Sequence, residues 1–445
     1  MSYSLAGKKE INTLHICFSD KSGGAARAAF RIHNSLSKFE KDKSLISRMR
    51  VLNKLSNDEK VISGNPKNQN LLWRKIHPRL NKLVKKNFFT QNNNLHTIAW
   101  PDTGLGYEIK KLKEKKIADI IHLHWLGDSL ISIEEIGRIK QPIIWTLHDQ
   151  WPFCGAEHYT IYRHKNKLIN TDKRFELGYK DSSRPLYETG KDLNKLTWLR
   201  KKACWKKQFE IVCPSTWMAD CVRRSELMHD WPISTIPYPI NLEIWKPFDK
   251  LKAREILNLP INKTLILYGA VGGTDDPRKG SYLLFEALEY LKQKASESSL
   301  ENLELVVFGQ EKSSNKKKTV FPTHFLGHFY DDLSLRLLYA SADLFVLPSI
   351  QDNLPQTGLE SQASGTPVVA FRTGGMIDIV DDKVTGALAD PFDPSELASS
   401  IQWVLEDRDR LRKLGTNSRM RAERIWNPSI IADKYMNIYQ KIFKE

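Results

Sequence analysis

Two acidic residues, Asp352 and Glu360, stand eight positions apart in the stretch QDNLPQTGLE. Paired carboxylates are typical of general acid and base chemistry, as in sugar hydrolysis, where both acids flank one bond. The local sequence favours another arrangement. The apolar run ADLFVLPS predicts a strand before this stretch, and Pro355 suits the first turn of a helix after it. Asp352 is therefore expected in a loop and Glu360 inside the helix, too far apart to act on one bond.

The start of that helix predicts a phosphate site. Free N–H groups at a helix N-terminus favour an anion, and here they belong to Gln356 and Thr357. Asn353, in the loop beside Asp352, is assigned to the same binding site. A carboxylate can accept two hydrogen bonds from the hydroxyls of a ribose or a sugar ring, so Asp352 and Glu360 are interpreted as a clamp for the two ends of a nucleotide sugar. The alternative is two solvated acids around a helix start.

A glycine-rich loop, GAVGGTDDPRKG, ends in two cations, Arg278 and Lys279. It follows a predicted strand and precedes a predicted helix. Arginine can chelate two phosphate oxygens and lysine acts as a compact point charge, so the pair suits a diphosphate. The spacing is not GxxxxGK[ST], which argues against a loop for nucleoside triphosphates. The alternative is a pair of ordinary surface charges.

Two further candidates follow predicted strands in the first half of the chain. In SDKSGGAARAA, Gly23 and Gly24 open a helix, where backbone N–H groups can approach an anion closely. The motif is not GxGxxG, and a tight connection is the alternative. In TLHDQWPFCG, His148 ends a strand, where it can donate a hydrogen bond to a hydroxyl or phosphate, and a pKa near neutrality would make proton chemistry available. A capping or core histidine is the alternative.

Short apolar runs rich in β-branched residues alternate with helical patterns, and the series occurs twice. This pattern is typical of a parallel sheet covered by helices on both faces. Ligands bind at the carboxyl ends of such strands, where the candidate motifs lie. We therefore predict an α/β protein with two doubly wound Rossmann-like domains that face a cleft. The predicted strands are 12–18, 118–125, 142–148, 210–215, 264–269, 303–309, 342–349 and 366–371, and the predicted helices are 24–38, 216–228, 281–294, 332–341 and 355–364.

The segment 236–249 carries three prolines and no clear periodicity, as expected of a linker. The predicted domains are residues 1–240 and 241–425, followed by a terminal helix at 426–445. That helix needs an apolar partner, because apolar residues recur on one of its faces: Ile430, Ile431, Tyr435, Ile438, Tyr439 and Ile442. The polar stretches 53–70 and 164–195 are predicted to be insertions or long loops.

The composition is that of an ordinary globular protein, with 41% apolar and 27% charged residues. No apolar run approaches the roughly 18 residues needed to cross a bilayer. The start of the chain lacks the basic end and apolar core of a signal peptide, so we expect a cytoplasmic protein. The five cysteines show no CxxC pair and no zinc-type spacing, so neither a disulfide framework nor a metal site is expected.

Lysine and arginine outnumber acidic residues by 68 to 52, a formal charge of +16 that favours an anionic partner. Part of the excess lies in residues 71–90, LLWRKIHPRLNKLVKKNFFT, which contain no acid and place apolar and cationic residues near helical spacing. Such a helix would contact the anionic inner face of the plasma membrane. The alternative is a surface helix packed on its own domain, interrupted at Pro78. No RNA-binding or helix-turn-helix signature is present, so nucleic acid is not expected as a partner.

In their order along the chain, these motifs resemble those of retaining glycosyltransferases of the two-domain GT-B architecture, family 4 (group 1). The resemblance covers nearly the whole chain and is centred on VLPSIQDNLPQTGLESQASGTPVVAF, which is similar to the family's region of two acids eight positions apart. HDQWPF and DPRKG resemble a subgroup that builds bacterial exopolysaccharide, capsule or lipopolysaccharide. Other matching stretches are SGGAARAA, HLHW, IVCPSTWM and PYPINLEIWKP.

The resemblance implies a role for each candidate residue. Glu360 resembles the residue that binds the ribose hydroxyls, and Asp352 resembles the acid that contacts the donor hexose. Arg278 and Lys279 resemble the basic pair on the diphosphate. His148 resembles the residue near the donor sugar.

The resemblance also assigns the larger parts of the chain. Gly23 and Gly24 resemble the glycine loop beside the phosphates, the first domain would bind the acceptor, and the second would bind the donor. The terminal segment resembles a crossover helix that packs on the first domain. Two positions depart from the family: its first acid is usually glutamate, one methylene longer than Asp352, and its arginine usually follows the strand's glycine, where this chain has Ala270.

These observations predict transfer of a hexose from a nucleoside diphosphate sugar to a glycan or lipid-linked saccharide, with retained configuration and without a metal or other cofactor. Two alternatives stay open. A nucleotide-sugar epimerase of the same architecture would convert the donor without an acceptor. A non-catalytic protein with a degenerate sugar site would bind anionic surfaces without donor turnover.

Overall fold

The computed structural model describes residues 10–40, 44–63, 96–100, 109, 118–127, 130–164, 167–269, 276–294, 302–309 and 319–444. The chain divides into two compact units. Unit 1 comprises residues 1–161, 169–236 and 431–445, and unit 2 comprises residues 162–168 and 237–430. The basic segment 71–90 lies outside the described residues. Within the described ranges, no helix combines the length and the apolar character that a membrane crossing requires.

In the described part of unit 1, seven parallel strands form one sheet in the order β3-β2-β1-β4-β5-β8-β9. The strands are β1 (Ile11–Ser19), β2 (Leu45–Asn53), β3 (Val61–Ser63), β4 (Ile120–Leu123), β5 (Ile143–Thr146), β8 (Glu210–Cys213) and β9 (Ile233–Thr235). The helices are α1 (Gly24–Ser35), η1 (Leu36–Glu40), α4 (Ile133–Gly137), α5 (Asp172–Glu176), η2 (Asp181–Ser183), α6 (Leu193–Cys204), α7 (Thr216–Arg224) and α16 (Pro428–Lys444). A separate hairpin joins β6 (Ile161–His164) and β7 (Lys167–Asn170).

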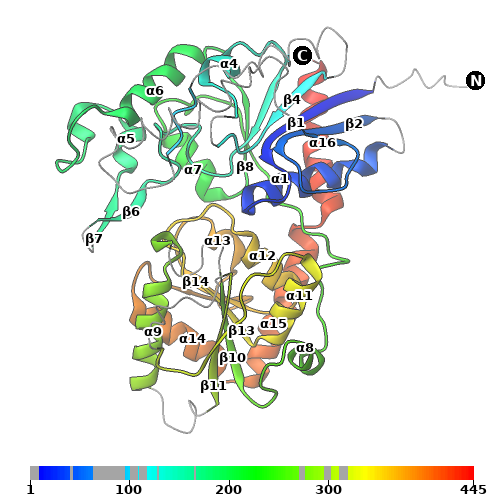
Figure 1. The fold of residues 1–445 in the computed structure, drawn as a ribbon, viewed down its shortest axis with the longest axis vertical. Coiled ribbons are helices and arrows are strands. Elements are labelled where there is room, and N and C mark those ends of the chain that lie inside the picture. The colour runs from blue at the N-terminus through cyan, green and yellow to red at the C-terminus, as the bar shows by residue number, and fades with distance from the viewer. Residues whose placement is uncertain are drawn as a thin grey trace, which may run out of the picture. The chain divides into compact units, whose positions relative to one another are not determined.

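Side chains alternate between the two faces of this sheet, because successive strand residues point to opposite sides. On the first face, Leu14 and Ile16 of β1 and Trp145 of β5 belong to a large apolar cluster with residues of α4, α6 and α7. On the second face, Cys17 of β1 packs with Ala29 of α1. Figure 1 shows α1 and α16 away from α4, α6 and α7, as this division requires. His15, which lies between Leu14 and Ile16 on β1, therefore points to the second face.

The C-terminal helix α16 packs on the second face of the unit 1 sheet. The hydroxyl of Tyr439 lies 2.7 Å from Nδ1 of His122, and the hydroxyl of Tyr435 lies 3.1 Å from Oγ1 of Thr146. The predicted apolar positions of this helix are buried or half-buried with one exception. Ile430 is 40% exposed, so its assignment to the apolar face is wrong.

In the described part of unit 2, six parallel strands form one sheet in the order β12-β11-β10-β13-β14-β15. The strands are β10 (Thr264–Gly269), β11 (Leu303–Phe308), β12 (Thr323–Phe325), β13 (Leu344–Leu347), β14 (Val368–Phe371) and β15 (Gly386–Ala389). The helices are α8 (Lys250–Ile256), η3 (Pro277–Lys279), α9 (Ser281–Lys294), α11 (Asp332–Ser341), α12 (Gln356–Ala363), α13 (Met376–Ile379), α14 (Pro394–Leu405) and α15 (Arg408–Ile425). Figure 1 shows α9 and α14 on one side of the strands and α11 and α12 on the other. Both sheets therefore have the doubly wound form that the sequence predicts.

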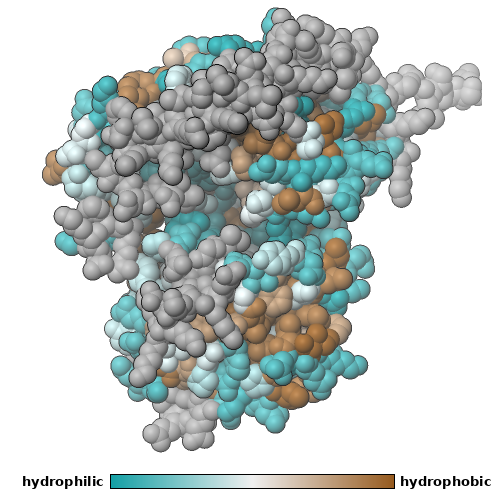
Figure 2. Space-filling view, viewed as in Figure 1, coloured by the Kyte–Doolittle hydropathy of each residue, from teal (hydrophilic) through white to brown (hydrophobic). Residues whose placement is uncertain are grey.

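Apolar side chains gather on the surface of unit 2 over α8 and α11 (Figure 2). Leu251 and Ile256 of α8 and Leu333 of α11 are each more than half exposed. These two helices therefore carry more apolar residues than their own packing buries.

The stretch 164–195, predicted to be an insertion or a long loop, lies between the neighbouring strands β5 and β8 and has regular structure of its own. It contains β7, α5 and the start of α6. Arg174 of α5 is only 1% exposed and forms ion pairs with Glu188, at 3.0 Å, and with Asp192. The long-loop alternative is therefore wrong, and the buried Phe175 and Tyr179 pack this segment together with the ion pairs of Arg174.

Candidate functional site

The loop before α9 brings the two predicted phosphate-binding cations to the end of the unit 2 sheet. The carboxylate of Asp276 accepts hydrogen bonds from the backbone N–H of Arg278, at 2.9 Å, and from its guanidinium, at 3.1 Å. Gly280 has a φ of 68°, in the region that favours glycine. A Cβ there would lie 1.8 Å from the carbonyl oxygen of Pro348. This close approach holds Arg278 and Lys279 beside the loop that follows β13.

Asp352 lies at that meeting point and pairs with both cations. Nζ of Lys279 is 2.5 Å from Oδ2 of Asp352, and Nη1 of Arg278 is 3.4 Å from the same oxygen. None of the three side chains is more than 17% exposed. Burial alone would raise the pKa of Asp352, but the charges of Lys279 and Arg278 lower it below 3.8. The acid predicted for the hexose and the cations predicted for the diphosphate therefore form one charged cluster.

The first turn of α12 places the other predicted donor-binding residues next to this cluster. The backbone N–H of Asn353 donates to Oδ1 of Asp352 at 3.0 Å. Pro355 is the N-cap of α12, and Gln356 and Thr357 are its first two residues. Pro355 thus lies one position before the predicted first turn, and the backbone N–H groups at the start of the helix belong to Gln356 and Thr357.

Glu360 lies inside α12, as the sequence predicts, and is only 1% exposed. The hydroxyl of Tyr339 on α11 donates a hydrogen bond to its Oε2 across 3.3 Å. Gln356 and Glu360 are four positions apart in the helix and share one face. The structure therefore places Glu360 behind the first turn of α12, while its role in ribose binding stays a prediction.

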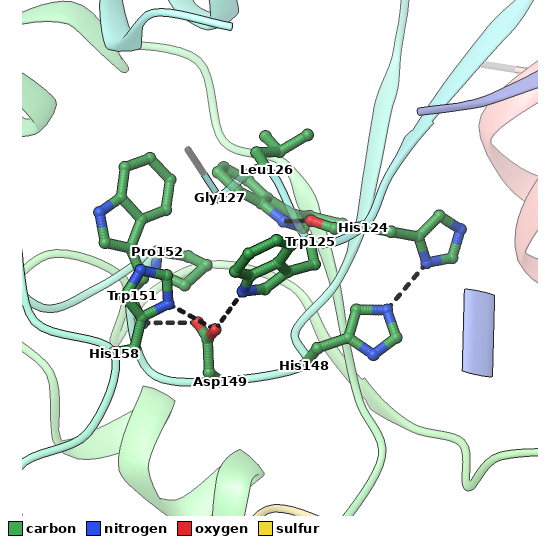
Figure 3. A pocket seen from close by; sticks show the side chains of 10 residues that line it. His124, Trp125, Leu126, Gly127, His148, Asp149, Trp151, Pro152 and His158 are labelled. Carbon is green, nitrogen blue, oxygen red and sulfur yellow. Dashed lines mark hydrogen bonds and ion pairs between the residues drawn. The ribbon is translucent and has the colours of Figure 1, made fainter. Parts of the chain in front are cut away.

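His148 follows β5 and lines a pocket in unit 1 together with His124, Asp149 and Trp151 (Figure 3). Its Nε2 lies 3.0 Å from Nδ1 of His124. Burial lowers the pKa of His148 from its ordinary value of 6.5 to about 4. The ring is therefore neutral at pH 7, and the prediction of a pKa near neutrality is wrong, because the end of β5 is covered by protein.

Asp149 accepts hydrogen bonds from three other residues that line this pocket. The sequence motif HDQWPF contains it, but it was not predicted as a site residue. It accepts hydrogen bonds from the indole of Trp125 at 2.8 Å, from the backbone N–H of Trp151 at 3.0 Å and from Nδ1 of His158 at 2.6 Å. Figure 3 shows the rings of Trp125 and His158 directed at this carboxylate. Burial would raise the pKa of Asp149, but the neighbouring His158 lowers it below 3.8.

A cluster of buried histidines lies on the second face of the unit 1 sheet and was not predicted. Nδ1 of His15 is 2.9 Å from Nε2 of His124, and His122 is held by the hydroxyls of Tyr439, at 2.7 Å, and Thr146, at 2.8 Å. Within the described ranges, one group of side chains could hold a metal ion, namely His15, His122 and His124. One ring nitrogen from each lies within 4.8 Å of the others. Apart from Nε2 of His15, their ring nitrogens already bond to one another, to His148 or to hydroxyls. A signal was present in the sequence, because His122 and His124 stand two positions apart and so share a strand face.

Gly23 and Gly24 open α1 in unit 1, as the sequence predicts. Gly23 has a φ of 87°, and a Cβ on either residue would meet no atom within 4 Å. No atom of the described residues therefore crowds the start of α1, and the phosphate contact of these glycines stays a prediction. The predicted site residues fall into two sets: Arg278, Lys279, Asp352, Asn353, Gln356, Thr357 and Glu360 in unit 2, and Gly23, Gly24 and His148 in unit 1.

Comparison with known families identifies the class to which unit 2 is related. Residues 249–421 match the family model described as glycosyl transferases group 1. The matched range contains the whole unit 2 set of candidate residues. Most of unit 2 therefore carries the sequence pattern of group 1 glycosyl transferases.

Parts of this chain are also similar to two curated relatives. D-inositol 3-phosphate glycosyltransferase 2 of Catenulispora acidiphila is 31% identical over 215 residues, 45% of this chain and 49% of that protein. The MMP alpha-(1->4)-mannosyltransferase of Mycolicibacterium hassiacum is 33% identical over 111 residues, 25% of this chain and 27% of that protein. The match thus spans about half of the first relative and about a quarter of the second.

Solved structures share the fold over nearly the whole chain. Sucrose-phosphate synthase from Thermosynechococcus elongatus aligns with a TM-score of 0.64 and 18% identity, covering 98% of this chain and 100% of that one. Anabaena HepE in complex with UDP-glucose aligns with a TM-score of 0.60, 16% identity and coverage of 97% and 100%. WaaG, a glycosyltransferase involved in lipopolysaccharide biosynthesis, aligns with a TM-score of 0.59 and 16% identity, covering 96% of this chain and 99% of that one. The protein therefore has the two-domain GT-B fold that its sequence predicts.

Proposed function

We propose that the protein is a glycosyltransferase that moves a hexose from a nucleoside diphosphate sugar to a hydroxyl of a glycan or lipid-linked saccharide, with retained anomeric configuration. The observation that carries the proposal is the convergence of Arg278, Lys279 and Asp352 beside the first turn of α12. The family match over 249–421 supports it, because that range contains the cluster. The UDP-glucose complex of HepE, which shares the fold, supports a nucleotide sugar as the ligand class.

In this proposal the cationic cluster acts on the departing diphosphate. Arg278 and Lys279 place positive charge where negative charge develops as the bond between sugar and phosphate breaks. The N–H groups of Gln356 and Thr357 add the dipole of a helix start. These groups supply the charge stabilisation, so we propose no metal or other cofactor and expect turnover to persist in a chelator.

The two acids would hold the remainder of the donor. Glu360 would bind the ribose hydroxyls, and Asp352 would contact the hexose while sharing Lys279 with the diphosphate. His148 and the glycine turn before α1 would contribute contacts from unit 1 to the sugar and the phosphates. A phosphate oxygen of the leaving group would accept the acceptor's proton, so no protein base is invoked.

We place the reaction in polysaccharide, capsule or lipopolysaccharide biosynthesis in the cytoplasm, at the inner face of the plasma membrane. WaaG, which shares the fold, is involved in lipopolysaccharide biosynthesis. The acid-free basic segment 71–90 has the charge that contact with anionic lipid requires. Replacing its lysines and arginines should abolish flotation with anionic liposomes, and unchanged flotation would argue against this membrane contact.

The test is a thermal-shift panel of nucleoside diphosphate sugars, because a ligand that binds only the folded state raises the apparent stability. One or a few donors should raise Tm in the wild type and in the control Lys252→Ala, which changes an exposed lysine of α8, but not in Lys279→Ala. Transfer should then require an added glycan acceptor. Absence of a shift with every donor would contradict the proposal, and conversion of the donor without an acceptor would indicate the epimerase.

A further inference from the structure

The second face of the unit 1 sheet lines up three imidazoles. His15 of β1 pairs in register with His122 of β4, and His124 lies two positions further along the same face. Nδ1 of His15 is 2.9 Å from Nε2 of His124, and Nδ1 of His124 is 3.0 Å from Nε2 of His148. His15, His124 and His148 therefore form one continuous hydrogen-bonded chain, and Figure 3 shows its His124–His148 link.

All three rings of this chain are neutral at pH 7. Burial lowers the pKa of His15 and His124 well below 6.5, and neighbouring imidazoles lower it further. Burial likewise lowers the pKa of His148 to about 4, although Asp149 opposes the effect. A neutral imidazole carries one proton, so each ring offers one donor nitrogen and one acceptor nitrogen.

With one proton on each ring, the chain has two arrangements. In the first, His15 donates through Nδ1 to His124, His124 donates through Nδ1 to His148, and His148 carries its proton on Nδ1. In the second, both hydrogen bonds are reversed. His148 then donates through Nε2, and His15 carries its proton on Nε2.

The surroundings of His15 select between the two arrangements. Its Nε2 is buried and has no hydrogen-bond partner in the described part of the chain. The second arrangement would leave an N–H there without an acceptor, and buried N–H groups without a partner are rare. The nearest imidazole on α1, His33, has its ring centroid 5.5 Å away, and its Nδ1 is bonded to Oγ of Ser47 at 2.7 Å. The first arrangement leaves only an unused lone pair, so it is favoured.

We propose that His15 and His124 are positioning residues that hold His148 in the tautomer with its proton on Nδ1. The row of hydrogen-bonded imidazoles ends in the interior at His15, so it offers no exit for a proton. It acts instead by fixing the orientation of each ring. His148 then faces the groups around its Nδ1 as a hydrogen-bond donor, the form that suits a sugar hydroxyl or a phosphate oxygen. That last step rests on the proposed function, whereas the tautomer does not.

The direct test is imidazole NMR of the full, ligand-free chain labelled with ¹⁵N-histidine at pH 7.5. Two-bond ¹⁵N–¹H correlations distinguish protonated from bare ring nitrogens, and His148 is assigned by the signals that His148→Gln removes. The expected result is a protonated Nδ1 and a bare Nε2. A proton on Nε2 or a charged ring would overturn the proposal. One equivalent of Zn²⁺ that displaces the shifts of His15 and His124 would overturn it too, because a metal would replace the chain.

Two variants of His15 separate positioning from packing. His15→Asn keeps an N–H near the place of Nδ1, whereas His15→Phe removes it. In His15→Phe we expect mixed tautomers at His148 and about tenfold weaker donor binding, on the scale seen when a supporting hydrogen bond is lost. In His15→Asn we expect the single tautomer and the wild-type donor affinity. The exposed control His229→Asn should change neither. Equal losses in both His15 variants would overturn the proposal. If no nucleotide sugar binds the wild type, the proposed function fails. The NMR measurement of the His148 tautomer still tests the role of His15 and His124.

Discussion

The ammonium group of Lys279 donates a 2.5 Å hydrogen bond to Oδ2 of Asp352 and so joins the loop after β10 to the loop after β13. Arg278 approaches the same oxygen at 3.4 Å. Each charge in the cluster therefore already has a counter-ion within unit 2. A diphosphate that binds here must share these cations with Asp352, which couples the proposed hexose contact to the proposed phosphate contact.

This pairing should appear as a coupling energy. Lys279→Met leaves Asp352 with the longer Arg278 contact, and Asp352→Asn leaves Lys279 with a neutral partner, so each change should lower the free energy of unfolding. A double-mutant cycle measured by urea unfolding should give a coupling of about 1.5–3 kcal/mol, the scale of hydrogen bonds to charged groups. The exposed control Lys252→Met should stay within about 0.5 kcal/mol of the wild type. Additive effects would show that the pair has no coupling.

The same lysine should matter more for turnover than for folding. If Lys279 stabilises the departing diphosphate, Lys279→Ala should lower turnover at least ~10²-fold, the scale for losing one group that stabilises developing charge. The measurement is donor consumption with a saturating acceptor, beside Lys252→Ala. Wild-type turnover in folded Lys279→Ala would remove this lysine from the mechanism.

Gly280 should be far less tolerant of a side chain than Gly327. Both have a positive φ, 68° and 71°, so an alanine at either position is strained to a similar degree. Among the described residues, a Cβ at Gly327 meets no atom within 4 Å, whereas at Gly280 it meets the carbonyl of Pro348 at 1.8 Å. Gly280→Ala should therefore lower the free energy of unfolding by about 1–3 kcal/mol more than Gly327→Ala. Equal losses in urea unfolding would show that the loop after β10 can move away freely.

Much of the fold could be read from the sequence, because continuous buried apolar runs identify parallel strands. In unit 2, the strand at 264–269 and the helices at 281–294 and 332–341 have the predicted bounds. The strand β2 was not predicted, although LISRMRVLN alternates between buried and half-buried positions. Of the two alternatives predicted for 164–195, the insertion agrees with the structure and the long loop does not. Its helix α5 was not predicted, since the ion pairs of the buried Arg174 leave no periodic pattern in the sequence.

The location of the candidate site could be predicted from the sequence, but the contacts between its residues could not. The strand ends located Lys279 and Asp352 at one edge of the sheet, while their pairing depends on the turn at Gly280, which brings residues 73 positions apart together. The neutral state of His148 depends on the depth of its burial, and His15 gave no motif at all. Contacts between distant side chains lie beyond what spacing along one chain can specify.

The buried histidines should make the protein sensitive to mild acid. Burial lowers the pKa of His33 from 6.5 to about 4 and that of His122 to about 3. Between about pH 6.5 and pH 4 the unfolded chain therefore binds more protons than the folded one, so stability is full above pH 6.5 and falls as the pH drops. Each such histidine adds up to about 1.4 kcal/mol per pH unit to this loss. Urea midpoints from pH 7.5 to 5 should fall less steeply in His33→Asn, and His229→Asn should follow the wild type.

Glu360 should govern affinity for the nucleoside part of the donor. Its carboxylate is 1% exposed and accepts a hydrogen bond from Tyr339 at 3.3 Å. Glu360→Gln replaces the charged acceptor, so affinity for the nucleoside diphosphate should fall about 10- to 100-fold, the equivalent of one hydrogen bond to a charged group. Tyr339→Phe removes the hydroxyl but keeps the ring packed against Trp245, so a smaller loss is expected. Calorimetry with the nucleoside diphosphate of the bound donor tests both, beside the exposed control Glu255→Gln. Unchanged affinity in Glu360→Gln would place the ribose elsewhere.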